Sequence, residues 1–198
     1  MTKHIDYYFT PVSPWTYLGS TVFTEMVRRH GASVTVKPVD FGKIFPVSGG
    51  LPLAKRAKQR QDYRLFELKR WRAYRQMPLN LHPKFFPANG DPAARLIIAA
   101  RKQGLDAMGL AHAILRAVWA EEKNIADPAT LLAIADAQKL DGKGLLAASE
   151  NPAIDAEYQA DTEAAITLGV FGAPTFIYQD EPFWGQDRLD FLDRALAG

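Results

Sequence analysis

A serine at the start of a helical pattern is the first residue that could do chemistry. Ser13 stands at an N-cap position, and Pro14 follows at the first helical position, where a missing N–H is harmless. A helix N-terminus offers unpaired N–H donors and partial positive charge, and the serine hydroxyl adds a further donor. Such a place favours an anion, although an ordinary capped helix would have the same sequence.

A second group of candidate residues lies near the C-terminus. Trp184, Gly185, Gln186 and Asp187 come just before the last amphipathic pattern. From its position alone, Asp187 is expected to be a simple helix cap.

Several kinds of site lack support in the sequence. The chain has no cysteine, so it forms no disulfide and has no thiolate ligand or cysteine nucleophile. Its four histidines show no paired metal-ligand spacing, no nucleotide-binding glycine motif is present, and Ser13 lacks the Gly-x-Ser-x-Gly setting of hydrolases. A net charge of +2 gives no bulk attraction to nucleic acid, and no apolar run reaches the length of a membrane span. We therefore expect a cytoplasmic protein that binds neither nucleic acid nor membrane.

The elements that position these residues alternate in type along the chain. Residues 4–9 predict a strand, residues 14–29 a helix and residues 34–39 a second, parallel strand. About five helices are expected next, and a β-hairpin and a final helix close the chain. The pattern predicts an α/β sheet domain, formed by residues 1–53 and 169–198, with an all-helical insertion over residues 54–168.

Two stretches between these elements could bind a ligand. Residues 40–53 contain three glycines and two prolines and predict a long loop, of a kind that often binds ligands. Lys43 in this loop is either a solvated lysine or the cation that meets a substrate carboxylate. Residues 54–76 carry nine lysines and arginines against two acids. They form either a solvated basic face over an aromatic stripe or a surface for an anionic ligand or acidic partner.

The motifs together resemble a known family. Residues 9–19, 169–176 and 183–189 are similar to the corresponding segments of 2-hydroxychromene-2-carboxylate isomerases and kappa-class glutathione transferases, and the resemblance covers the whole chain. Both groups are thioredoxin-like proteins related to the DsbA-like oxidoreductases. The stretch 48–52 is a weaker match, because relatives often carry asparagine where this chain has Gly50 or Leu51.

The resemblance implies a thioredoxin-like fold with a large helical insertion, and glutathione as the cofactor. Ser13 would replace a redox cysteine and act on the glutathione sulfur as the catalytic residue. Ala173, followed by a cis Pro174, would pair with the cysteine part of the tripeptide, and residues 184–187 would hold its γ-glutamyl end. The residues expected to contact the substrate are Lys43, Gly50, Leu51 and Phe86.

The reaction implied by the resemblance is the isomerisation of 2-hydroxychromene-2-carboxylate to trans-o-hydroxybenzylidenepyruvate, in the breakdown of aromatic compounds. A kappa-like glutathione transferase, which would keep the glutathione adduct, is one alternative. A cysteine-free thioredoxin-like module that binds a partner through the basic stretch is another. The expected small-molecule partner is an aromatic carboxylate, and a homodimer stays open.

Overall fold

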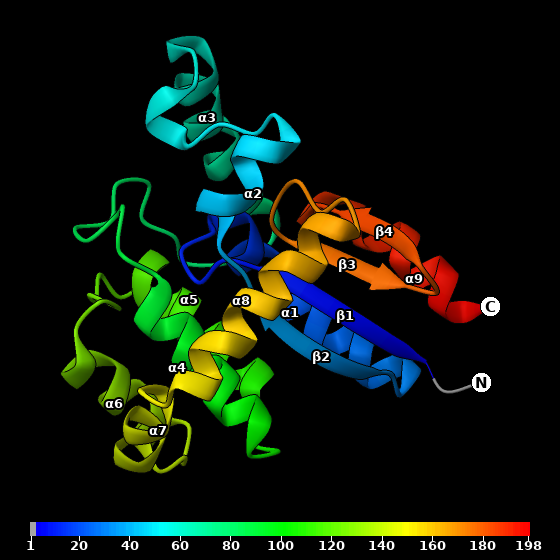
Figure 1. The fold of residues 1–198 in the computed structure, drawn as a ribbon. Coiled ribbons are helices and arrows are strands. Elements are labelled where there is room, and N and C mark those ends of the chain that lie inside the picture. The colour runs from blue at the N-terminus through cyan, green and yellow to red at the C-terminus, as the bar shows by residue number, and fades with distance from the viewer. Residues whose placement is uncertain (1–2) are drawn as a thin grey trace.

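The computed structural model describes residues 3–198 and shows a four-stranded sheet covered by helices (Figure 1). The strand order is β2-β1-β3-β4; β1 and β2 are parallel, whereas β3 is antiparallel to both β1 and β4. In chain order the elements are β1 (His4–Phe9), α1 (Pro14–His30), β2 (Ser33–Pro38), α2 (Phe41–Ser48), α3 (Lys58–Tyr74), α4 (Asp91–Lys102), α5 (Ala107–Trp119), α6 (Pro128–Ala137), α7 (Gly142–Ser149), α8 (Pro152–Thr167), β3 (Thr175–Tyr178), β4 (Glu181–Trp184) and α9 (Leu189–Ala197), with short 3-10 turns at Leu53–Lys55 and Gln186–Arg188.

The predicted strand–helix–strand unit at the N-terminus is confirmed. Helix α1 begins at Pro14 after the Ser13 cap and ends at Gly31, which adopts the left-handed conformation with φ of 60°. The backbone N–H of Ala32 donates to the carbonyl of Val27 at 3.0 Å and closes the helix end. The chain can then return as β2, so that Tyr7 of β1 lies opposite Val36.

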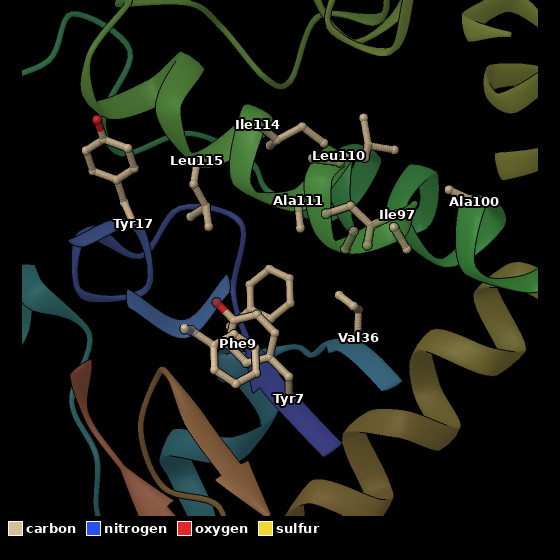
Figure 2. Packing of buried hydrophobic residues seen from close by; sticks show 14 of the residues in the cluster. Tyr7, Phe9, Tyr17, Val36, Ile97, Ala100, Leu110, Ala111, Ile114 and Leu115 are labelled. Atoms are coloured by element: carbon tan, nitrogen blue, oxygen red, sulfur yellow. The ribbon is translucent and has the colours of Figure 1, made fainter. Parts of the chain in front are cut away.

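The two faces of β1 pack against different helices because side chains alternate along a strand. Tyr7 and Phe9 face the main core and stack with ring centroids 4.7 Å apart. Figure 2 shows both rings below helix α5, with Leu110 and Ala111 among the labelled side chains above them. On the opposite face, Tyr8 belongs to a smaller cluster with residues of α2 and α8. The inserted helices therefore share their core with the sheet.

The structure corrects the prediction of a loop over residues 40–53. Helix α2 forms there, because the Asp40 carboxylate accepts the backbone N–H of Gly42 at 2.7 Å and caps the helix. Phe41 and Ile44 anchor it in the smaller cluster, and Gly49 ends it with φ of 76°. Burial of these apolar side chains outweighs the composition that suggested a loop.

The helical stretch contains six helices, α3 to α8, and not the five that the pattern suggested. The additional helix is the short α7, whose cap is Asp141: its carboxylate accepts the backbone N–H of Gly144 at 2.9 Å. No proline follows this cap, whereas Pro128 and Pro152 mark the starts of α6 and α8. Within residues 3–198, no helix combines the length and apolar character that crossing a bilayer requires.

Candidate active site

Two adjoining cavities lie where the N-terminus of α1, helix α3 and the loop before β3 meet. The inner pocket has a volume of about 420 Å³ and contains Ser13, whereas the outer pocket has a volume of about 500 Å³ and extends along residues 184–187. Five residues line both pockets: Trp15, Arg56, Arg64, Ala173 and Trp184. The two pockets therefore form one continuous site with two compartments.

Ser13 lines the inner pocket and is buried, with 6% of its surface exposed. Its Oγ accepts the backbone N–H of Thr16 at 3.1 Å, as expected for an N-cap. Among residues 3–198, no acceptor engages the hydroxyl hydrogen, so the hydroxyl can donate to a group in the pocket. The helix N-terminus adds partial positive charge at the same place. The site is therefore suited to an anion.

The loop before β3 places backbone groups beside Ser13. The Ala173–Pro174 peptide bond is cis, and Ala173 lines both pockets. The carbonyl of Pro174 accepts the backbone N–H of Gly185 at 2.9 Å. This hydrogen bond joins the loop to residues 184–187, so that two segments predicted from the sequence to act together lie side by side.

Residues 184–187 form a wall of the outer pocket. Gln186 is buried, and its side-chain and main-chain oxygens accept hydrogen bonds from Arg75, the residue that follows α3, at 3.0 to 3.4 Å. Asp187 lies inside the 3-10 turn and caps no helix: its carboxylate instead pairs with Arg188 at 2.7 Å. Its side chain is 40% exposed, so the carboxylate remains accessible to a ligand.

Only two of the four residues expected to contact the substrate line the inner pocket. Gly50 and Phe86 line the inner pocket. Leu51 is half exposed and is not among the residues that line either pocket. Its carbonyl accepts a hydrogen bond from the pocket residue Arg56 at 2.8 Å. The ammonium of Lys43 turns toward α8, where it bonds to the side chain of Gln159. Lys43 is therefore not among the residues that line either pocket.

The cations of the inner pocket are instead two arginines of the basic stretch, Arg56 and Arg64. The Arg64 guanidinium lies over the rings of Phe86 and Trp119, 5.4 and 5.5 Å from their centroids. Burial and the neighbouring Arg56 lower the pKa of Arg64 to about 10. In the sequence, both arginines belong to the basic stretch 54–76 and nothing distinguishes them from its other cations. The excess of cations over acids was the available signal, but it did not identify which side chains enter the site.

The inner pocket also has an acidic end. Asp40 and Asp91 line it together with Tyr158, whose hydroxyl donates to Asp91 Oδ1 at 3.2 Å. Burial, and then the charges of Asp91 and Asp40, raise the pKa of Tyr158, so it stays neutral and acts as a hydrogen-bond donor. Across residues 3–198, no three side chains of the metal-binding types come close enough together to hold a metal ion.

Comparison with known proteins agrees with this geometry. The family model of the DSBA-like thioredoxin domain matches residues 4–197. A 2-hydroxychromene-2-carboxylate isomerase of Sphingobium xenophagum is 31% identical over 99% of this chain and 99% of its own length. The human protein Glutathione S-transferase kappa 1 is 22% identical over 100% of this chain and 92% of its own.

A solved structure of a 2-hydroxychromene-2-carboxylate isomerase superposes with a TM-score of 0.80 at 27% identity, covering 98% of this chain and 94% of the other. The family resemblance and the thioredoxin-like fold expected from the sequence are thus confirmed. This chain belongs to the DSBA-like thioredoxin-fold proteins and, within them, to the 2-hydroxychromene-2-carboxylate isomerase family.

Proposed function

We propose that this enzyme binds glutathione across the two pockets and uses it to interconvert 2-hydroxychromene-2-carboxylate and trans-o-hydroxybenzylidenepyruvate. The observation that carries the proposal is the hydrogen bonding of Ser13. Its Oγ accepts the backbone N–H of Thr16, which leaves the hydroxyl hydrogen free to donate to a ligand at the helix N-terminus. The names of the isomerase relative and of the glutathione transferase relative support the substrate and the cofactor, respectively. A cytoplasmic location and a homodimeric assembly also remain proposals.

The residues of the site fit the chemical groups of glutathione. Ser13 would hold the sulfur as a thiolate, because a hydroxyl donor and a helix N-terminus both favour the anion. The backbone of Ala173 would pair with the cysteine part of the tripeptide. Asp187 would pair with the γ-glutamyl ammonium in the outer pocket. This pocket has a volume of about 500 Å³ and adjoins the inner pocket at the five residues that line both.

When bound, glutathione supplies a thiolate that can add to a conjugated carbon, allow rotation about the resulting single bond, and leave again. The inner pocket would orient the substrate for this chemistry. Trp15 and Phe86 provide flat apolar walls for an aromatic ring. The hydroxyl oxygen of Tyr158, whose hydrogen is donated to Asp91, would accept a hydrogen bond from a hydroxyl group of the substrate. The chain needs no cysteine for such a cycle, because it involves no net redox change.

A kappa-like transferase, which keeps the adduct, is the second candidate, and the human relative favours it. The two differ in whether free thiol is consumed. The test is to incubate enzyme, glutathione and the chromene acid while following both the absorbance of the ring-opened product and the concentration of free thiol. We expect product formation over many turnovers with no loss of thiol.

S-methylglutathione is the matched control, because it keeps the peptide but cannot form a thiolate. It should raise the melting temperature by binding the folded protein and support no turnover. Stoichiometric loss of thiol would favour the transferase. Equal turnover without glutathione would contradict both functions.

A further inference from the structure

We propose that Arg64, with Arg56 beside it, binds the carboxylate of the aromatic substrate in the inner pocket and thereby makes the enzyme selective for aromatic acids. This inference rests on the proposed function, since it assigns the substrate-recognising cation of the same site. It replaces Lys43, whose ammonium is engaged by Gln159 of α8.

The Arg64 side chain is held in a defined position. Its guanidinium lies over the rings of Phe86 and Trp119, which pack against each other with centroids 4.8 Å apart. The indole N–H of Trp119 in turn donates to the carbonyl of Val12, next to the catalytic serine, at 3.2 Å. A planar cation is therefore fixed against an aromatic wall that is tied to the Ser13 loop. Such a guanidinium can donate two parallel hydrogen bonds to one carboxylate.

Neither pocket arginine has a carboxylate partner among residues 3–198. The two acids of helix α3 are engaged elsewhere: Asp62 pairs with Lys58, and Glu67 pairs with Arg70. Arg56 donates only to the carbonyl of Leu51. Burial and mutual repulsion lower the pKa of Arg64 to about 10, with no opposing effect of a carboxylate. Asp40 and Asp91 line the same pocket but form no ion pair with either arginine, so two adjacent cations in a partly desolvated pocket are free to bind an anionic ligand.

The anion that best matches this position is a flat aromatic acid. Phe86, the ring beneath Arg64, lines the inner pocket with Ser13 but not the outer pocket. An aromatic ring placed against Phe86 would bring an attached carboxylate to the guanidinium. The peptide part of glutathione has its own partners in residues 184–187. The arginine pair therefore serves the second substrate rather than the tripeptide.

The test uses a pair of unreactive probes, 2-naphthoate and its neutral isostere 2-naphthamide, titrated into the enzyme by calorimetry. The wild-type enzyme should bind the acid more tightly than the amide. Arg64→Met should weaken binding of the acid about 10- to 100-fold, the usual cost of losing charged hydrogen bonds, and leave binding of the amide unchanged. Arg64→Lys keeps the charge without the planar guanidinium, so its affinity for the acid should lie between those of the wild-type enzyme and Arg64→Met. Arg56→Met should weaken the acid less than Arg64→Met.

The matched control is Lys69→Met, which removes an exposed cation from the same helix outside both pockets. It should leave both affinities unchanged. Three results would overturn the inference. The wild-type enzyme could bind the acid no more tightly than the amide, or Arg64→Met could weaken binding of the acid and the amide equally. In the third case, Arg64→Met would weaken binding of glutathione and leave binding of the acid unchanged.

Glutathione binding is measured in parallel by calorimetry. If the wild-type enzyme fails to bind glutathione, the proposed function fails. The ratio of the affinities for 2-naphthoate and 2-naphthamide still decides the role of Arg64 in that case, because it depends on neither thiol nor turnover.

Discussion

The indole of Trp184 lies so close to Gly172 that no side chain fits between them. A Cβ built on Gly172 would be 2.3 Å from Trp184 Nε1. Phe171 also contacts the indole, with ring centroids 4.7 Å apart. Because Trp184 lines both pockets, the shape of the proposed glutathione site depends on a glycine that precedes the cis Ala173–Pro174 bond.

We predict that Gly172→Ala displaces the indole and weakens glutathione binding. Trp184 is half exposed, so the ring can move outward and the fold should persist. Calorimetry should show weaker binding of glutathione, and the tryptophan fluorescence should change. Gly90→Ala is the control at the same pocket, since its Cβ would meet its nearest neighbour, Val12, at an ordinary 3.5 Å. Equal effects of both substitutions would contradict the prediction.

Replacing Ser13, the proposed catalytic residue, should separate turnover from binding. Ser13→Ala should lower the rate about 100- to 1000-fold, the typical cost of losing one positioned donor, with a much smaller effect on glutathione affinity. The variant also loses a helix cap, which costs about 1 kcal/mol of stability. Asp141→Ala removes a cap of similar type from α7, far from the chemistry, and should reduce stability without reducing the rate. An unchanged rate in Ser13→Ala would mean that the helix terminus alone activates the thiol.

Arg75 should act as a positioning residue for the outer pocket. Its guanidinium donates to both oxygens of Gln186, so Arg75→Met should loosen residues 184–187. We expect the KM for glutathione to rise while kcat changes little. Arg72→Met, in the last turn of α3, is the matched variant; it loses a hydrogen bond to the carbonyl of Leu79 and should leave the KM for glutathione unchanged. A drop in kcat at unchanged KM would argue against a positioning role.

His112 should make stability depend on pH. Its Nε2 is buried without a partner among residues 3–198, and its Nδ1 lies 3.2 Å from the hydroxyl of Thr24. Burial lowers the pKa of His112 from 6.5 to about 4. The unfolded chain therefore takes up a proton first as the pH falls. The free energy of unfolding should decrease between pH 6.5 and 4, by up to about 3 kcal/mol, and be unaffected above that window.

Denaturant unfolding at several pH values checks this prediction. His112→Phe should flatten the slope between pH 6.5 and 4, whereas replacing the exposed His82 with glutamine should not. A slope that survives in His112→Phe would assign the pH dependence to other groups.

Local sequence patterns determined most of the elements. Alternation in residues 4–9 and the Ser13–Pro14 cap defined β1 and the start of α1, because a strand period and a cap depend on neighbouring residues only. Helix α2 was missed, since its glycines and proline favour a loop and the burial of Phe41 and Ile44 that stabilises it comes from tertiary packing. The short helix α7 was not predicted, because no proline follows its cap to mark the start of the helix.

The site shows the same division. Local sequence indicated Ser13 through its helix cap, and the resemblance of two short segments to a known family indicated Ala173 and residues 184–187. The sequence could not identify Arg64 as the pocket cation or remove Lys43 from the pocket. Both are basic residues with similar local surroundings. Which of them faces the pocket depends on how α3 and α2 dock against the sheet, and that docking is set by contacts between residues far apart in the chain: the Arg64 guanidinium comes to lie over Phe86 and Trp119, and the Lys43 ammonium reaches Gln159.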